Sequence, residues 1–258
     1  MVLAAAYGWW EAGWVRLRVL ELPLDGLPAE LDGLRIAHLS DFHLGVPSRG
    51  VRAVERAVDW VAERRPDMVC VTGDLLSRPR GQKRLRSLLE RLGHPYVVLG
   101  NHDLALSRDP FARAVELDAL EHGTLLNDAA VIANGIEIAG VDPRSWLARR
   151  SSGFAASDAG LRILLCHFPR ALERVPAGRW HLILAGHLHA GQINLPYGRR
   201  GRLMLAHPRS RYSHGLYRRG ETVMHVSPGL GTTFLPFRFF ARPEATELVL
   251  RCVRDGRT

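Results

Sequence analysis

From Leu34 onward, short apolar runs alternate with amphipathic segments. Valine and alanine recur at helical spacing over residues 50–65 and Pro66 follows, so we expect an amphipathic helix that ends there. A second helix is predicted over residues 85–92 and a third around residues 110–122. Apolar, β-branched runs between them predict strands at residues 35–40, 67–72, 96–100, 161–166 and 181–186. This alternation is typical of a layered α/β fold.

The remaining pattern adds a hairpin and several shorter strands. Asn134-Gly135 lies between two apolar runs, which is a strong signal for a two-residue hairpin turn. Further strand-like pieces lie near residues 202–206, 215–218, 222–227 and 246–253. A chain of 258 residues can bury a large core as one unit. We therefore expect a single α/β domain over residues 34–258, preceded by an apolar and aromatic lead-in and flap over residues 1–33.

The lead-in is rich in tryptophan. Its uncharged stretch before Glu11 is shorter than the roughly 20 residues that a helix needs to span a bilayer. It also lacks the basic start and the small-residue cleavage site of a secretory signal. Trp9, Trp10 and Trp14 suit either a membrane interface, where indole rings are enriched, or a flap packed on the core. The flap is the interpretation that we favour.

Five of the predicted strands end in polar residues that can bind a metal. These residues are Asp41 and His43, Asp74, Asn101, His167, and His187 with His189. In layered α/β folds, ligands bind outside the carboxyl ends of the strands, so these segments should meet at one rim. A single histidine after a strand is more often a structural residue than a ligand. Five such events at five strand ends make a metal site the stronger interpretation.

The residue types of this cluster favour two divalent metal ions. On extended backbone, Asp41 and His43 would point to the same side, as would His187 and His189, so each pair could present two ligands to one locus. The carboxylate of Asp74 can bridge two cations. Imidazoles, carboxylates and one amide, without thiolate, suit manganese, iron or zinc. Seven ligands are too many for one metal, and two metals can clamp the attacking and leaving oxygens of an in-line displacement.

The chain contains, in this order, the motifs DFH (41–43), GD (73–74), GNHD (100–103), His167 and GHLH (186–189). This order is typical of the calcineurin-like metallophosphoesterase superfamily, which the chain resembles across residues 34–192. The resemblance implies an α/β fold, a two-sheet β-sandwich flanked by helices. It implies one metal held by Asp41, His43, Asp74 and His189, and another held by Asp74, Asn101, His167 and His187. It also implies that His102 lies beside the leaving group as general acid or electrostatic stabiliser, oriented by Asp103. An imidazole can donate a proton near neutrality.

Segments around the motifs narrow the resemblance. Residues 31–36, 186–196, 212–217, 227–231 and 242–244 are similar to a bacterial, often membrane-associated branch. Some members of that branch cleave the pyrophosphate of UDP-2,3-diacylglucosamine, and others are general phosphodiesterases. We therefore expect a phosphodiesterase or pyrophosphatase that uses a metal-bridging water on a small or lipid-linked anionic substrate. Three cysteines without CxxC spacing favour a reducing compartment, so we expect a location in the cytoplasm or on the inner face of the membrane.

The charge of the chain favours an anionic partner. Lysine and arginine outnumber aspartate and glutamate by 35 to 26, which suits a phosphorylated substrate, peripheral contact with an anionic membrane, or nucleic acid. Nucleic acid ranks lower, because no RNA- or DNA-binding motif accompanies the charge. Residues 197–220 hold arginines and no acid. Because a guanidinium group matches phosphate oxygens, the candidates for substrate contact are Arg199, Arg200, Arg209 and Arg211.

Two other interpretations use the same site. A nuclease or a protein phosphatase would cleave DNA or a phosphopeptide in preference to sugar nucleotides. A non-catalytic metal-binding scaffold would keep the fold without the reaction. Such scaffolds usually lose metal ligands or the acid, whereas Asp74, Asn101 and His102 are all present here. The scaffold is therefore the less favoured interpretation.

Overall fold

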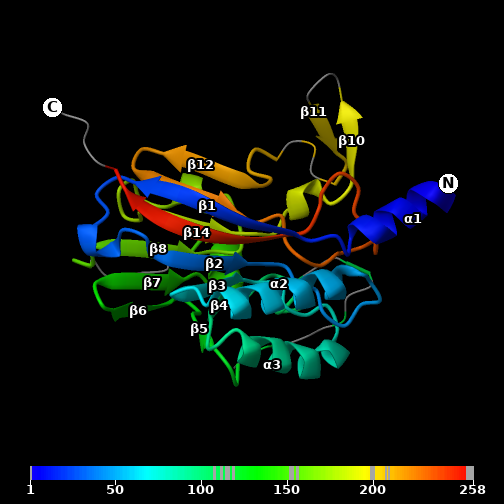
Figure 1. Ribbon diagram of the computed structural model, residues 1–258, viewed down its shortest axis with the longest axis horizontal. Helices are drawn as coiled ribbons and strands as arrows, with labels where there is room; N and C mark the ends of the chain where they lie inside the picture. Colours follow the sequence, from blue (N-terminus) through cyan, green and yellow to red (C-terminus); the bar gives the residue numbers. More distant parts are fainter. Residues whose placement is uncertain are drawn as a thin grey trace.

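Two six-stranded sheets pack face to face in the structure, a computed structural model that describes residues 2–106, 109–110, 113, 117, 120–150, 154, 157–197, 201–206, 208 and 210–253 (Figure 1). The first sheet has the strand order β1 (Arg16–Leu24), β14 (Glu244–Cys252), β2 (Arg35–Leu39), β3 (Met68–Thr72), β4 (Tyr96–Val98) and β5 (Thr124–Leu125). The second has the order β12 (Gly215–Arg219), β13 (Thr222–Val226), β9 (Leu182–Ala185), β8 (Leu161–Leu165), β7 (Ile136–Gly140) and β6 (Ala129–Ala133).

Parallel pairing dominates the part of each sheet that carries the predicted ligands. Strands β2, β3, β4 and β5 are parallel neighbours, and so are β13, β9, β8 and β7. Antiparallel pairs lie toward the edges, where β6 and β7 form the hairpin that Asn134-Gly135 predicts. Because parallel strands end at the same edge, the loops that follow β2, β3 and β4 lie side by side.

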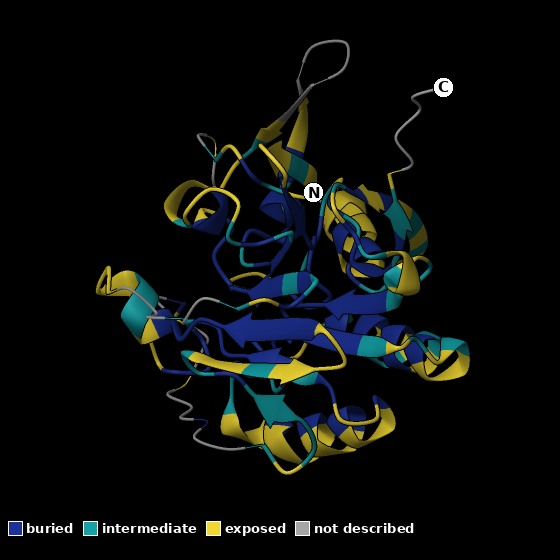
Figure 2. Cartoon of the chain, turned by 90° about the vertical axis from the view of Figure 1, so that its left-hand side faces the viewer, coloured by how far each residue is buried: buried dark blue, intermediate teal, exposed yellow. Residues whose placement is uncertain are grey.

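Alternating side chains place the core between the sheets and under the helices. Ile36 and Cys70 face the layer between the sheets, where they meet Ile163 and Leu182 of the second sheet. The intervening strand residues face the helices instead, as Leu39 does. Buried strands accordingly fill the middle of the molecule, and exposed residues lie on the outer turns of the helices, on loops and on the edge strand β6 (Figure 2). This confirms the predicted α/β sandwich flanked by helices.

The long helices cover the outer face of the first sheet (Figure 1). They are α2 (Gly50–Arg64) and α3 (Gln82–Arg91), which confirm two predicted helices. Helix α2 ends at Arg64: the N–H of Arg65 makes the last helical bond, to the carbonyl of Val61, and the left-handed backbone of Arg65 and the following Pro66 prevent further helix. Shorter helices α4 (Pro143–Leu147) and α5 (Ala171–Arg174) adjoin the second sheet. Most of the helix predicted around residues 110–122 lies outside the described residues.

The first residues form a helix and an edge strand. Helix α1 (Val2–Glu11) packs on the segment that precedes β14, where Tyr7 lies 6.1 Å from Phe239 between ring centroids. The buried carboxylate of Glu11 accepts hydrogen bonds from the backbone N–H groups of Phe240 and Ala241. Strand β1 then pairs with β14 along its whole length. Within the described part of the chain, no helix combines the length and the apolar character needed to cross a membrane.

A two-stranded ribbon and three 3-10 turns complete the described part of the fold. Strands β10 (Asn194–Tyr197) and β11 (Gly201–Met204) form a separate two-stranded ribbon, and η1 (Ala29–Leu31), η2 (Pro79–Gly81) and η3 (His189–Gly191) are single 3-10 turns. The ribbon and α1 project on the same side of the sandwich (Figure 1).

Candidate metal centre

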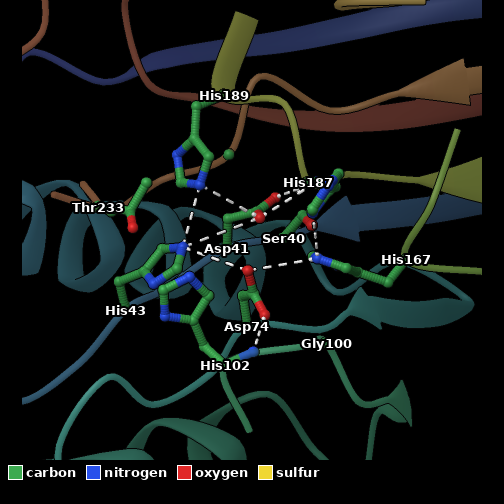
Figure 3. A network of polar contacts seen from close by, with 12 residues as sticks. Ser40, Asp41, His43, Asp74, Gly100, His102, His167, His187, His189 and Thr233 are labelled. Carbon is green, nitrogen blue, oxygen red and sulfur yellow. Dashed lines mark hydrogen bonds and ion pairs between the residues drawn. The ribbon is translucent and has the colours of Figure 1, made fainter. Parts of the chain in front are cut away.

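The predicted ligands meet at the carboxyl ends of strands from both sheets. Asp41 and His43 follow β2, Asp74 follows β3 and Asn101 follows β4 in the first sheet. His167 follows β8, and His187 and His189 follow β9 in the second sheet. The labelled side chains point toward one another across the gap between the two sheet edges (Figure 3). Residues up to 148 positions apart in the sequence are thus neighbours.

One group of ligand atoms consists of Asp41, His43, Asp74 and His189, all buried. The Nε2 atoms of His43 and His189 lie 3.0 Å apart. Nε2 of His189 lies 3.4 Å from Oδ1 of Asp41, and Nε2 of His43 lies 3.5 Å from Oδ2 of Asp74. Such convergence of imidazole nitrogens and carboxylate oxygens is a set of donors that could hold one cation.

A second group consists of Asp74, His167 and His187, and shares Asp74 with the first. Nε2 of His167 lies 3.3 Å from Oδ2 of Asp74 and 3.0 Å from Nδ1 of His187. Asn101 lies in the loop after β4, and its buried Oδ1 accepts no hydrogen bond from the residues that the structure describes. A buried amide oxygen without a donor is costly, so this atom fits a ligand of a bound cation. The donor set therefore fits two cations joined through Asp74.

The backbone of the ligand loops is strained. Asp41, His43, Asp74, His187 and His189 all have positive φ, between 46° and 76°. This corrects the expectation that the Asp41/His43 and His187/His189 pairs lie on extended backbone. Left-handed turns, not strand alternation, aim both members of each pair inward. Non-glycine residues in this region are rare, and strain of this kind clusters at functional sites because the surrounding structure holds it.

Two motif glycines leave room for the ligand carboxylates. A Cβ on Gly100 would overlap Oδ1 of Asp74, and a Cβ on Gly186 would overlap Oδ2 of Asp41. Each glycine therefore lets a loop from one strand close over the carboxylate of another. The glycines of the GNHD and GHLH motifs thus have a packing reason, the close approach of another loop.

Burial and mutual charge set the protonation of the cluster. Burial raises the pKa of Asp41 to about 6, and nearby Asp74 adds to that rise. Burial would also raise the pKa of Asp74, but the adjacent histidines, His167 first, hold it well below its usual value. Burial lowers the pKa of His43 to about 3, whereas Asp74 and Asp41 outweigh burial and raise the pKa of His167 to about 9. An ionised carboxylate and neutral imidazoles are the forms that bind cations, so a cation here would have to displace the proton that the two carboxylates hold on His167.

His102 and Asp103 lie beside this cluster. The backbone N–H of His102 donates to Oδ1 of Asp74 at 2.9 Å, and its ring stands edge-on to that of His43 at 4.6 Å between centroids. Both carboxylate oxygens of Asp103 accept backbone N–H groups, from Leu76 and Gly100, at 2.9 Å. Asp103 therefore ties the loop after β4 to the loop after β3, and it fits a positioning role that acts on His102 through the backbone.

Arg238 is a further residue of the centre that the sequence pattern does not indicate. Its guanidinium is fully buried, and it donates to Nδ1 of His189 at 3.1 Å and to the carbonyl of Gly231 at 2.7 Å. Burial lowers the pKa of Arg238 to about 10. It lies in an irregular segment far from every motif, and a buried arginine among aromatic residues (FLPFRFF) is the only sequence signal of its position.

The structure describes one of the four arginines predicted to contact substrate, Arg211. Arg199, Arg200 and Arg209 lie outside the described residues. Arg211 lines a cavity of about 380 Å³ together with His187 and Phe168, and its guanidinium lies 5.6 Å from the ring of Tyr212. Arg211 is therefore near the second ligand group, and contact of the four arginines with substrate stays a prediction.

A cavity of about 770 Å³ opens over the cluster. Asp74, Asn101, His102, His187 and His189 form its floor. Its walls are mainly apolar and include Leu106, Leu147, Phe168, Ile193, Leu205, Phe234 and Leu235. Binding sites for small molecules are commonly apolar clefts of this size with a few convergent polar groups.

Comparison with known proteins agrees with this geometry. The sequence model of the family described as calcineurin-like phosphoesterase matches residues 34–191. The chain is 33% identical over 255 residues to a transmembrane protein with metallophosphoesterase domain from Danio rerio; the match covers 90% of this chain and 56% of that relative. It is 30% identical to the metallophosphoesterase YkuE of Bacillus subtilis, over 87% of this chain and 82% of the relative. It is 28% identical to the phosphodiesterase YaeI of Escherichia coli, over 94% and 89% of the two chains.

Proposed function

The chain belongs to the calcineurin-like phosphoesterase family, and from this premise we propose that it hydrolyses phosphodiester or pyrophosphate bonds at a centre of two divalent metal ions. The observation that carries the proposal is the meeting of two ligand groups at one shared carboxylate, Asp74. Asp41, His43, Asp74 and His189 would hold one ion. Asp74, Asn101, His167 and His187 would hold the other. Manganese, iron and zinc fit this donor set.

Bound cations supply Lewis-acid chemistry: they neutralise phosphoryl oxygens and make an activated water available as nucleophile. The protein residues supply the rest of the chemistry. In the proposal, His102 donates a proton to the leaving oxygen as the bond to phosphorus breaks. Its place on the cavity floor, next to Asp74 and largely buried, supports that role. Asp103 keeps the loop of His102 fixed through Gly100.

A diester or pyrophosphate with an apolar part is the substrate class that the cavity supports. The relative named a phosphodiesterase matches nearly the whole chain. The cavity over the ligands is roomy, and Leu147, Ile193 and Leu235 in its walls suit an aryl or acyl group. Arg211, beside His187, would attract the negative charge of the phosphate. We therefore include lipid-linked substrates together with small ones.

Peripheral contact with the anionic inner face of a membrane is the second part of the proposal. Helix α1 exposes Val2 and Leu3 at 83% and 87%, together with Trp9 and Trp10. Its acid, Glu11, is buried and hydrogen-bonded, so the exposed face presents apolar and aromatic groups. Arg242, which stacks over Trp14 at 3.5 Å, supplies positive charge beside it. Tryptophan next to arginine suits the boundary between headgroups and acyl chains.

Hydrolysis of bis(p-nitrophenyl) phosphate tests the proposed reaction. We expect turnover with Mn²⁺, loss of turnover in EDTA, and recovery when the metal is returned. Asp74→Asn removes charge from the carboxylate that both groups share, and it should abolish turnover and reduce the bound metal. A metal-loaded protein that hydrolyses no diester, monoester or pyrophosphate would contradict the proposal. Faster cleavage of DNA or phosphopeptide than of sugar nucleotides would instead support the nuclease or protein phosphatase interpretation.

A further inference from the structure

A second cavity, of about 610 Å³, lies beside the outer face of the second sheet. Five arginines line it: Arg149, Arg150, Arg170, Arg174 and Arg179. Two indole rings, those of Trp146 and Trp180, form its apolar walls. No carboxylate is among the lining residues that the structure describes. A pocket with this lining has a strongly positive potential and flat faces on which a ring can stack.

The arginines differ in how far acids neutralise them. Arg179 pairs with Glu137, and Arg170 lies 3.3 Å from Glu173. Arg149 and Arg150 form no ion pair with any residue in the described part of the chain. Their backbone is fixed nonetheless, because their N–H groups bond the carbonyls of Trp146 and Ser145 at 3.1 and 3.0 Å. Two adjacent arginines are therefore anchored through their backbone, and their exposed guanidinium groups are not neutralised by an acid of the described residues.

Stacked side chains join this cavity to the metal centre. The guanidinium of Arg174 lies 4.0 Å over the ring of Trp146, and Trp146 stacks on Phe168 at 5.8 Å with an angle of 11°. Phe168 in turn contacts the ring of His187 at 4.9 Å between centroids. Trp146 and Arg170 also line the small cavity that holds His187 and Arg211. That small cavity in turn shares Phe168 and His187 with the cavity over the ligands, so the arginine cavity and the ligand cluster are neighbours.

We propose that this cavity binds a second phosphate group of the substrate while the scissile phosphoester lies at the metal centre. The proposal rests on the proposed function and narrows it to phosphoesters that carry a further phosphate. Arg149 and Arg150 would contact the phosphate, since arginine binds phosphate oxygens through charge-assisted, often bidentate hydrogen bonds. Trp146 would pack against the part of the substrate that joins the two groups.

A matched pair of chromogenic substrates tests the inference. Thymidine 5′-(p-nitrophenyl phosphate) is compared with the same diester that carries an additional 3′-phosphate. In each case one water is consumed, the bond from phosphorus to the aryl oxygen breaks, and nitrophenol and a thymidine 5′-phosphate are released. We expect a lower KM for the 3′-phosphorylated substrate. Arg149→Ala/Arg150→Ala should raise that KM about tenfold or more and change the KM of the other substrate less than about twofold.

The matched control is Arg52→Ala/Arg56→Ala, which removes two exposed arginines from α2 and leaves the cavity intact. It lowers the net charge of the protein by the same amount. It therefore separates binding of phosphate in the cavity from general attraction of the anionic substrate to a basic protein. An equal rise of KM in both double variants, or no rise with Arg149→Ala/Arg150→Ala, would overturn the inference.

Calorimetry separates this inference from the proposed reaction. Thymidine 3′,5′-diphosphate is titrated into the protein in EDTA, where no catalysis occurs. We expect binding that Arg149→Ala/Arg150→Ala weakens about tenfold or more and Arg52→Ala/Arg56→Ala leaves unchanged. Equal affinity in the wild type and the Arg149→Ala/Arg150→Ala variant would overturn the inference even if both diesters are hydrolysed. If neither diester is hydrolysed, the proposed reaction fails, and the titration still decides whether the cavity binds phosphate.

Discussion

Arg238 holds His189 from two sides: its guanidinium donates to Nδ1 of the ring at 3.1 Å and to the backbone carbonyl of the same residue at 3.5 Å. Arginine can only donate, so Nδ1 of His189 is the acceptor. The proton of the neutral ring then lies on Nε2, which faces Asp41 and His43, and a cation bound at Nε2 would have to displace it. The same guanidinium bonds the carbonyls of Pro228, Gly231 and Ala241. One buried side chain thus fixes both a candidate ligand and the loop that packs on Asp41.

Arg238→Lys should weaken metal binding while it keeps the positive charge. The ammonium group cannot reproduce the planar fork, so the ring of His189 loses its orientation. Loss of such an outer partner typically lowers metal affinity by about 10–100-fold. Calorimetric titration of each metal-free protein with Mn²⁺ measures the change in metal affinity.

Stability provides a second readout for this substitution. Buried carbonyls left without a donor cost about 1–3 kcal/mol each, so denaturant unfolding of the metal-free protein should shift to lower concentration. Arg242→Lys is the matched control, because Arg242 is partly exposed and donates to carbonyls away from the ligand groups. Unchanged Mn²⁺ affinity in Arg238→Lys would show that Arg238 supports the fold alone.

His102→Ala should keep the metal and lose turnover. The imidazole contacts His43 but belongs to neither ligand group, so metal content should stay near that of the wild type. Turnover of a diester with a poor leaving group should fall by roughly 10²–10⁴, the usual contribution of a positioned acid.

A substrate series checks that assignment. A diester whose leaving group is p-nitrophenol needs less help from an acid, so His102→Ala should affect it less than an alkyl ester. An equal loss for both esters would argue for electrostatic stabilisation in place of proton donation. Unchanged turnover would remove His102 from the mechanism.

The location of the centre could be predicted from the sequence, because parallel strands bring their carboxyl ends to one edge. Asp41, Asp74 and His167 each follow an apolar run, and that pattern suffices to place them together. The geometry of the loops could not be predicted in the same way. Asp41 and His43 point inward through left-handed turns, and neither residue type predicts a positive φ at these positions.

Two features depend on how distant segments return to the site. Arg238 lies 49 residues from His189, in a segment without regular pattern, and only its packing reveals its role. Strand β1 was not predicted, because Arg16, Arg18 and Glu21 interrupt its apolar run. Their side chains are exposed or half-buried along an edge strand that pairs with β14 on one side, and that position tolerates charge.

Mild acid should destabilise the metal-free protein through the buried pair His38 and His225. Their Nδ1 atoms lie 2.7 Å apart, and both rings are fully buried. Burial lowers the pKa of His225 to about 3 and that of His38 well below its usual value. Unfolding therefore takes up protons between the ordinary histidine pKa of about 6.5 and these lowered values, so stability falls as pH falls through this window.

The size of the effect can be measured by denaturant unfolding in EDTA. Each such histidine contributes a slope of at most about 1.4 kcal/mol per pH unit. His225→Gln should reduce the slope between pH 6.5 and 4.5, whereas His94→Gln, at an exposed position, should leave it unchanged. His43 and His189 also contribute to the dependence of stability on pH. Their contributions cancel in this comparison, since both variants retain these two residues. A slope that stays the same in His225→Gln would contradict the assignment.

Leu3→Glu should reduce binding to anionic vesicles without loss of catalysis. Leu3 is 87% exposed on α1, so the substitution leaves the core and the ligands untouched. A leucine that enters the interface gains about 1.5–3 kcal/mol, and a glutamate there is repelled by phosphatidylglycerol, so the bound fraction should fall about tenfold or more. Co-sedimentation with vesicles of phosphatidylglycerol and phosphatidylcholine measures the bound fraction. The control is Ile132→Glu, because Ile132 is 62% exposed on β6, and β6 lies on the opposite side of the view in Figure 1 from α1. If both variants bind as the wild type does, α1 is a flap of the enzyme and not a membrane contact.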